Sequence, residues 1–292
     1  MGRLLIDLKF SKYGMRKFVT RFLCWQYKCQ KCECEFSSRD QMPDLQAYGH
    51  GLVSWCIYLN VACGVNMSRV RKSLGDAFAI FTGGSQIDRF KQSAAEYYAP
   101  LYEEILIKVL QESALHVDET TVNLRGESGY VWVLTTMDKV YYFYRPSREG
   151  SFLKEMLAPF KGVLISDFYA AYDTLSCTQQ KCIVHFVRDI DDDLLRNPLD
   201  TELKCIAQEF GTLLRMIIKT VDSYGLKSRH LRKHKWAVCR FLDLVGSRDY
   251  SSELANGYKK RFTKSGAKMF TFLDFDGRTN YLQVIIPAGG GY

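Results

Sequence analysis

The stretch ALHVDETTV, residues 114–122, places two adjacent carboxylates, Asp118 and Glu119, directly after a short apolar run and before two threonines. The apolar run predicts a strand that ends at Asp118. Asp and Thr are also common turn formers at strand ends, and for an isolated stretch an ordinary turn is the simpler explanation. A chemical role for the carboxylates therefore depends on what else the chain brings to the same place.

A second acid occupies an equivalent position further along the chain. In KGVLISDFYAAYDTL, residues 161–175, the apolar run Val163–Ile165 predicts a strand buried on both faces, which ends at Asp167. Ligands collect at strand ends in α/β sheets, so Asp118 and Asp167 would approach closely if their strands are neighbours. A divalent cation such as Mg²⁺ would relieve their repulsion, and a pair of such ions supports phosphodiester chemistry.

The segments around these acids predict the fold class. Residues 114–119, 129–136 and 139–146 are short, rich in β-branched and aromatic residues and separated by turn clusters, which predicts three consecutive antiparallel strands. A helix over 147–160, the fourth strand, and a short strand that runs into a helix over 181–195 follow. This order predicts an α/β fold with a mixed sheet and helices packed against it.

A helical region precedes the strands. Two short helices are predicted within residues 51–64 and 67–81, and a long one over 86–112. The second segment carries three basic residues, so the pair would suit a helix-turn-helix whose second helix enters a DNA major groove. A packing subdomain with a basic face explains the same pattern.

Charge is unevenly distributed along the 292-residue chain. Forty Lys and Arg against 32 Asp and Glu give a formal net charge of +8. Residues 3–31 hold eight basic residues and one acid, and residues 227–268 hold twelve basic residues and three acids. Two basic blocks that flank a more acidic middle predict a polyanion partner held at both sides. Two solvated protein faces explain the charge pattern about as well.

Cysteine usage and hydropathy bear on the compartment. Ten cysteines are too sparse for a disulfide-stapled domain and favour a reducing compartment. The charged N-terminus is not a signal peptide, and residues 45–68, the longest uncharged segment, predict a buried helix of a soluble protein rather than a membrane span. Cys29 and Cys32 form half of a zinc-ligand set, so they indicate either a remnant Zn²⁺ module that contacts DNA or a short hairpin with free thiols.

Taken together, these motifs resemble the DDE transposases of the insertion sequence 66 type, which have a ribonuclease-H-like catalytic domain. The resemblance extends from about Phe10 to Gly277. The matching segments are YGHGL (48–52), HVDET (116–120), GYVWV (129–133), YYFYRPSREGSFLKEML (141–157), KGVLISDFYAAYDTL (161–175), QQKCIVHFVRDIDDDLL (179–195) and FLDFDG (272–277).

The resemblance implies a function in DNA transposition. Asp118 and Asp167 would be the first two acids of a triad that binds Mg²⁺ or Mn²⁺, and Glu119 would be a neighbour rather than a ligand. The implied partners are double-stranded DNA at transposon ends and a second copy of the chain or an intact transposase. The implied location is the cytoplasm of a prokaryote, at the nucleoid. Cys182 and His185 match a Cys-x2-His element to which the residues themselves assign no role.

The chain also departs from the family pattern at both ends. A second Cys pair would lie before Met1, and no Asp or Glu follows Asp276, so the third acid was not found. The sequence therefore predicts a copy that is truncated or frameshifted and catalytically impaired. Expected domains are a partial zinc-finger-like segment (1–40), a helical region (41–112) and the catalytic domain (113–292), with a helical basic part at about 190–268 and an aberrant tail at 278–292.

Three functions compete at this point. The first is a transposase that cuts and joins DNA by metal-dependent chemistry. The second is a non-catalytic protein that binds transposon ends or partners an intact transposase. The third is a different ribonuclease-H-like nuclease, which would recruit a carboxylate such as Glu253 or Asp276.

Overall fold

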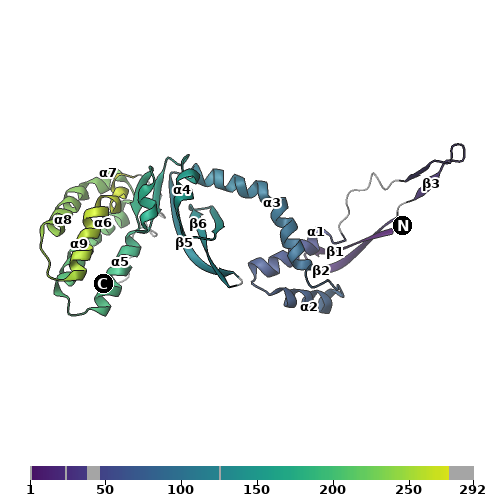
Figure 1. The fold of residues 1–292 in the computed structure, drawn as a ribbon, viewed down its shortest axis with the longest axis horizontal. Coiled ribbons are helices and arrows are strands. Elements are labelled where there is room, and N and C mark those ends of the chain that lie inside the picture. Colours follow the sequence, from purple (N-terminus) through teal and green to yellow (C-terminus); the bar gives the residue numbers. More distant parts are fainter. Residues whose placement is uncertain (1, 24, 38–46, 125, 276–292) are drawn as a thin grey trace. The chain divides into compact units, whose positions relative to one another are not determined.

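The computed structural model describes residues 2–23, 25–37, 47–124 and 126–275. The chain divides into two compact units, Met1–Pro100 and Leu101–Tyr292, and each is described by itself (Figure 1). Helix α3 (Gln86–Leu110) begins in the first unit and ends in the second.

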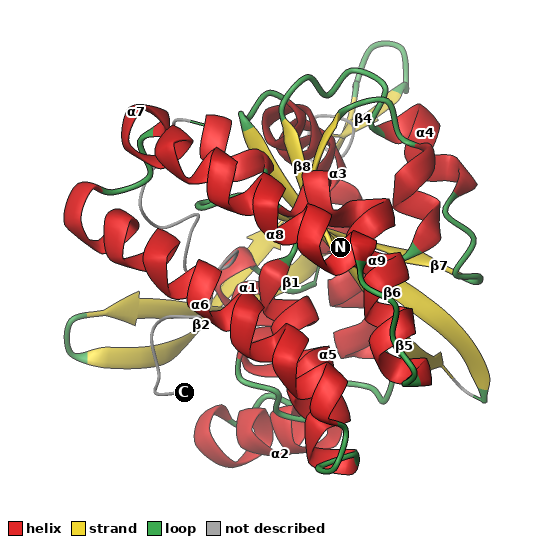
Figure 2. Cartoon of the chain, turned by 90° about the vertical axis from the view of Figure 1, so that its left-hand side faces the viewer, coloured by secondary structure: helices red, strands yellow, loops and turns green. Residues whose placement is uncertain are grey.

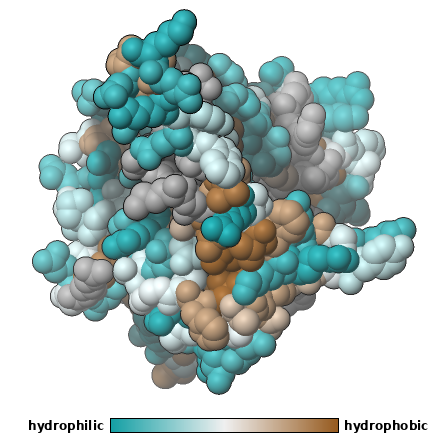
Figure 3. Space-filling view, turned by 90° about the vertical axis from the view of Figure 1, so that its right-hand side faces the viewer, coloured by the Kyte–Doolittle hydropathy of each residue, from teal (hydrophilic) through white to brown (hydrophobic). Residues whose placement is uncertain are grey.

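The first unit combines two small hairpins with helices. Strands β1 (Gly2–Ser11) and β2 (Gly14–Leu23) pair antiparallel, as do β3 (Gln26–Lys28) and β4 (Glu35–Ser37). The helices are α1 (His50–Ile57), the π-helical turn η2 (Tyr58–Ala62), α2 (Met67–Phe78) and the start of α3. Figure 3 shows a face of the molecule on which hydrophilic and hydrophobic residues lie next to one another.

The YGHGL segment joins the β1–β2 hairpin to α1. Asp7 Oδ1 accepts a hydrogen bond from the Leu52 backbone N–H at 2.9 Å, which satisfies a donor near the start of α1. A Cβ on Gly49 would lie 2.2 Å from Asp7 Cγ, and one on Gly51 would lie 2.0 Å from the Leu8 carbonyl oxygen. Both positions therefore need glycine, because any side chain would push the helix off the strand.

The buried helix predicted over residues 45–68 is only partly correct. Helical structure covers α1 and η2, and of these residues Leu52 and Cys56 are buried while Tyr58 and Val61 are exposed. The low polarity of the segment reflects one buried stripe and several uncharged surface residues. Among the described residues, no helix combines the length and apolar character needed to cross a bilayer.

The second unit is built on a five-stranded mixed sheet in the order β7-β6-β5-β8-β9. Strand β5 pairs antiparallel with β6 and parallel with β8, and β8 pairs parallel with β9. The strands are β5 (Ala114–Leu124), β6 (Glu127–Thr135), β7 (Val140–Arg145), β8 (Val163–Ser166) and β9 (Thr178–Lys181). The predicted mixed sheet is confirmed, and this architecture fits a ribonuclease-H-like fold.

Helices cover the sheet (Figure 2). The short elements between strands are α4 (Ser151–Met156) and η3 (Ala170–Thr174). The C-terminal helices are α5 (Ile183–Arg196), α6 (Thr201–Tyr224), α7 (Ser228–Leu231), η4 (Arg232–His234), α8 (Lys235–Ser247), α9 (Glu253–Met269) and η5 (Thr271–Asp274).

Alternation along the central strands divides the core in two. Leu115, Val117 and Leu164 pack with residues of α3, α4 and η3 on one face. Ala114 and Ile165 pack on the other face with α5, α6, α8 and α9. Successive side chains of a strand point to opposite faces, so the chemistry of a polar residue in β5 depends on whether its number is odd or even.

Candidate active site

The register of the central strands relates the two candidate acids. In the parallel pair, Ala114 lies opposite Val163 and His116 opposite Ile165. Asp118 lies two residues beyond His116, and Asp167 lies two residues beyond Ile165, so both acids are equally far from the last pair. By alternation Asp118 lies on the face that carries Ala114, which the C-terminal helices cover, and Asp167 is the first residue after β8.

The prediction that Asp118 closes its strand is wrong. Strand β5 continues to Leu124, because Asp118 and the residues after it pair with β6 as far as Glu127. What ends near Asp118 is the parallel pairing, since β8 stops at Ser166. Asp118 therefore lies inside β5, where the strand still pairs with β6 but no longer pairs with β8. Asp167 directly follows the end of β8.

The first turn of α5 faces both acids. The Cys182 backbone N–H donates to the Ser166 carbonyl at 2.7 Å, which ties the start of α5 to the end of β8. The pKa of His185, one turn into the helix, is raised by a hydrogen bond with the Cys182 thiol, against burial, and further by the negative charges of Asp118 and Asp167. Both carboxylates therefore act on the pKa of the same imidazole.

His116 lies two residues before Asp118 on the same face. Burial lowers its pKa to about 4, so the ring is neutral at pH 7. Its Nε2 is buried and has no hydrogen-bond partner among the described residues. The ring thus adds an uncharged polar atom to this face of the sheet, and no charge.

Glu119 points to the opposite face and is already engaged. Its side chain is 2% exposed, and Oε1 accepts two hydrogen bonds from Arg148, at 2.8 Å from Nε and 2.6 Å from Nη2. Oε2 accepts a hydrogen bond from the Tyr172 hydroxyl at 2.5 Å. These partners occupy both oxygens of the Glu119 carboxylate.

The loop after Asp167 is fixed by the same group of side chains. Asp167 Oδ1 accepts from the Tyr169 backbone N–H at 2.8 Å, and the Arg148 guanidinium lies 4.3 Å from the centre of the Tyr169 ring. Burial, the hydrogen bond to Glu119 and the nearby acids raise the pKa of Tyr172, so its hydroxyl stays protonated as a donor. Sequence reasoning missed these three residues, although all lie in segments that carry the family resemblance.

A buried lysine supports Asp167 from the adjacent strand. Lys181, at the end of β9, is 1% exposed, and its Nζ lies 3.0 Å from the Asp167 carbonyl oxygen and 3.3 Å from Asp173 Oδ1. Burial alone would raise the pKa of Asp173, but a hydrogen bond from Lys264 and the charges of Lys181 and Lys268 lower it to about 2. The network links α9 to the loop that carries Asp167.

A sequence model of the transposase IS66 family matches residues 46–242, which is more than half of the chain. The chain belongs to this family. The match spans both Asp118 and Asp167 and confirms the resemblance drawn from the motifs. No curated protein matches the chain at a significant level.

The donor set of Asp118 and Asp167 suits a hard divalent cation. Asp118 is exposed and Asp167 half-buried, and each uses only Oδ1 to accept a backbone N–H among the described residues. The second oxygen of each carboxylate is thus left for a hard cation, which takes one or two carboxylates and completes its shell with water and phosphate. No group of three or more Cys, His, Asp or Glu among the described residues could by itself hold a metal.

The other expected ligands, Cys29, Cys32, Glu253 and Asp276, belong to other segments of the chain. Cys29 and Cys32 lie at the β3–β4 hairpin as free thiols, where the Cys29 N–H donates to the Cys34 carbonyl at 2.9 Å. Glu253 is the first residue of α9 and is exposed. Asp276 and the tail 278–292 lie outside the described residues. The zinc site and the third acid stay predictions.

Proposed function

We propose that Asp118 and Asp167 together bind a divalent cation, Mg²⁺ or Mn²⁺, at transposon ends, as the first two acids of the metal site of an IS66 transposase. The proposal is carried by the position of the two acids, each two residues beyond His116 and Ile165, the last pair of the neighbouring parallel strands, and by the influence of both charges on His185. A bound cation would supply Lewis-acid stabilisation and an activated oxygen for phosphodiester cleavage and strand transfer. Glu119 is not part of this ligand set.

The surrounding residues would act by holding the two carboxylates in place. Lys181 donates a hydrogen bond to the Asp167 carbonyl oxygen, and the Tyr169 backbone N–H donates one to the Asp167 side chain. The Glu119–Arg148 pair joins the opposite face of β5 to the loop after β7. Because misplacement of a ligand by about 1 Å costs on the order of 100-fold in rate, such supports matter even though none of them contacts the metal.

The proposal includes weak catalysis by residues 1–292. No carboxylate follows Asp276 in this sequence, and two acids hold a second metal ion loosely. Cleavage would then be slow although the fold and the first metal position are retained. A chain that carries an additional family-type Glu segment after Gly277 should cut faster.

A non-catalytic DNA-binding protein is the second candidate, and the exposed cations favour it. Five exposed basic residues lie on the β1–β2 hairpin: Lys9, Lys12, Arg16, Lys17 and Arg21. In this proposal residues 1–40 and 41–112, which precede the catalytic domain 113–292 in the sequence, contact duplex DNA. A second copy of the chain or an intact transposase completes the assembly at the nucleoid. For about six phosphate contacts, the slope of log K against log salt should be near −5.

Metal binding and strand cleavage test the two proposals separately. Asp118→Asn and Asp167→Asn should each weaken Mn²⁺ binding, followed by electron paramagnetic resonance, by at least about tenfold. Asp222→Asn is the matched control, because Asp222 is an exposed acid on α6. If neither change affects Mn²⁺ binding, the metal site is refuted. If the chain cuts labelled transposon-end DNA efficiently and Asp167→Asn abolishes this, the proposed impairment is wrong.

A further inference from the structure

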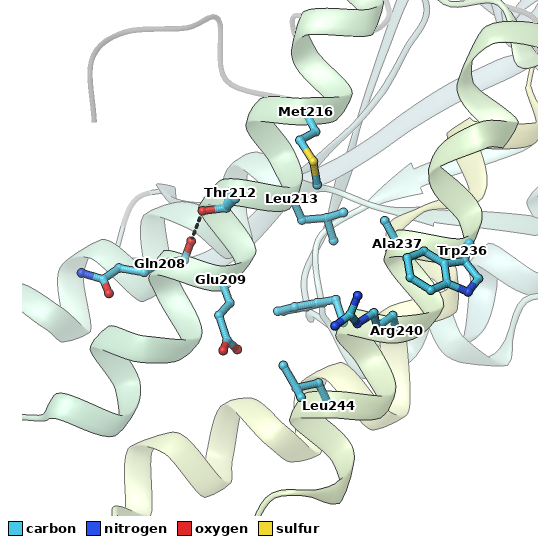
Figure 4. Close-up of a pocket in the computed structure, with 10 residues that line it drawn as sticks. Gln208, Glu209, Thr212, Leu213, Met216, Trp236, Ala237, Arg240 and Leu244 are labelled. Carbon is cyan, nitrogen blue, oxygen red and sulfur yellow. Dashed lines mark hydrogen bonds between the residues drawn. The ribbon is translucent and has the colours of Figure 1, made fainter.

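Helices α6 and α8 enclose an apolar groove on the surface of the second unit. Its volume is about 560 Å³, and Met216 and Leu213 of α6 face Trp236, Ala237 and Leu244 of α8 (Figure 4). The Trp236 side chain is 70% exposed. A large aromatic ring left at the mouth of an apolar hollow is typical of a site that receives a partner.

Positive charge is concentrated in the segment that leads into α8, and Arg240 of this segment lines the groove. Residues 227–240 hold six Lys and Arg and no Asp or Glu. Two of these cations share one carboxylate, because Arg232 and Lys235 contact Asp274 at 3.2 and 2.6 Å. The other four are exposed and form no ion pair with any described residue: Lys227, Arg229, Lys233 and Arg240.

The histidines of this segment add no positive charge near pH 7. Burial lowers the pKa of His234, and the charge of Lys233 lowers it further. The pKa of His230 is likewise lowered, by burial and then by Arg229 and its cationic neighbours. The positive potential therefore comes from lysine and arginine and persists across the neutral pH range.

The tryptophan ring has a cation beside it, and the segment before it is joined to α6. The Arg240 guanidinium carbon lies 5.3 Å from the centre of the Trp236 ring, one helical turn away. Thr220 of α6 and His234, two residues before Trp236, are joined by a hydrogen bond of 2.8 Å between Oγ1 and Nε2. An exposed aromatic ring beside unpaired cations is the arrangement that stacks unpaired nucleotide bases and contacts their phosphates.

We propose that the groove between α6 and α8 binds an unpaired DNA strand, with one base stacked on Trp236 and the backbone phosphates beside Lys233 and Arg240. The inference rests on the proposed function, because strand cleavage and transfer at DNA ends expose unpaired nucleotides. A base inside an intact duplex already stacks on both faces, so Trp236 selects unpaired strands. Charge complementarity favours DNA over a protein helix as the occupant, since residues 227–240 hold four cations without an ion pair to a described residue and no acid, and Glu209 in the groove is paired with Arg248.

Binding of a fluorescein-labelled 12-nucleotide single strand and of the matching duplex, measured by anisotropy, tests the role of the ring. Trp236→Ala should bind the single strand about 5- to 100-fold more weakly, which is the usual effect of removing one base–aromatic stack. Trp236→Phe should keep most of the affinity, and duplex binding should change little. Tyr97→Ala is the control, because Tyr97 is 77% exposed and lies outside this unit.

A single strand that contains 2-aminopurine gives a second readout, since stacking on Trp236 should quench its fluorescence and Trp236→Ala should abolish the quenching. Lys233→Ala should lower the salt slope of single-strand binding by about 0.7. Lys204→Ala should not, because Lys204 is an exposed cation on the same helix as Thr220 but about 24 Å along it, at 1.5 Å per residue.

The outcomes separate this inference from the proposed function. Single-strand binding and quenching that are unchanged in Trp236→Ala overturn the inference alone, provided that the duplex still binds. Loss of self-association in Trp236→Ala, with DNA binding intact in sedimentation experiments, shows a protein interface and also overturns it. If the unaltered chain binds neither DNA at low salt, the proposed function fails together with the inference.

Discussion

Asp118 and Glu119 are adjacent in the chain, yet the two faces of β5 treat their carboxylates in opposite ways. On one face Glu119 is 2% exposed, and its two oxygens accept hydrogen bonds from Arg148 and Tyr172. On the other face Asp118 is exposed, and only its Oδ1 accepts a hydrogen bond, from the next backbone N–H at 2.9 Å.

The difference shows how one strand separates stability from chemistry. A carboxylate whose oxygens are all used by protein donors stabilises the fold and is closed to a ligand. A carboxylate with an unused oxygen contributes little to stability but can bind a cation. Predictions about the residues of the two faces should therefore differ in both size and kind.

The largest effect on stability is expected for Glu119→Ala. The substitution leaves the buried Tyr172 hydroxyl without its acceptor and removes the partner of Arg148, so the free energy of unfolding should fall by about 3–4 kcal/mol. Urea denaturation followed by circular dichroism measures it. Glu104→Ala, which breaks a surface pair with Lys108 at 2.7 Å, should cost less than about 1 kcal/mol. Equal losses of unfolding free energy in the two variants would mean that the hydrogen bonds of Glu119 with Arg148 and Tyr172 are not formed.

The next effect is a pH dependence that originates on the Asp118 face. The folded chain keeps His116 neutral down to about pH 4, whereas the unfolded chain takes up this proton below its ordinary pKa of 6.5. The contribution of neutral His116 to the free energy of unfolding is therefore fully present above pH 6.5. It is lost as the pH drops towards 4, by about 3 kcal/mol in total.

Urea denaturation of the unaltered chain and of His116→Gln at pH 7, 5 and 4 isolates this contribution. The variant should lose less stability than the unaltered chain over this pH interval, whatever its stability at pH 7. Parallel pH profiles would show that the ring of His116 is not buried in the neutral form.

A smaller pH effect is expected from Asp173, which neither face of β5 contains. Its pKa is lowered from 3.8 to about 2 by the lysines around it, against burial. This contribution is present above pH 3.8 and is lost as the pH falls through 2, and it amounts to about 2 kcal/mol. Asp173→Asn should flatten the stability profile between pH 4 and 2. A profile as steep as that of the unaltered chain would contradict the lysine network.

The sequence was sufficient to place β5 to β8 but not every strand. It did not predict β1 and β2, and the strand predicted to begin at residue 181 lies at Thr178–Lys181 instead. Apolar runs predicted β6, β7 and β8 closely, because each is followed by a break in composition. Strand β5 was predicted too short, since Asp118 and Glu119 interrupt its alternation. The threonines that follow are β-branched and pair with β6, so pairing with a neighbour overrode the local signal.

The site was predictable only where it depends on strand order. Asp118 and Asp167 could be related from sequence once the two strands were assumed to be neighbours. The contacts of Arg148 and Tyr172 with Glu119 join residues 29 and 53 positions apart, and no periodicity reports such contacts. The contact of Lys181 with Asp173 could not be predicted either, because a lysine at a strand end is usually solvated.

The smallest effect on stability is expected for Asp118→Asn, and it completes the comparison with Glu119. The amide oxygen of Asn can still accept the bond from the Glu119 N–H, and the side chain is exposed, so the free energy of unfolding should change by no more than about 0.5 kcal/mol. Mn²⁺ affinity should nevertheless fall at least about tenfold, because a neutral amide is a weaker ligand than a carboxylate. Glu119→Gln should behave in the reverse way, with lower stability and, in the molecules that remain folded, Mn²⁺ affinity within about threefold of the unaltered chain. If Asp118→Asn instead unfolds the chain and leaves Mn²⁺ binding unchanged, then both faces of β5 are structural and the open carboxylate is not a metal ligand.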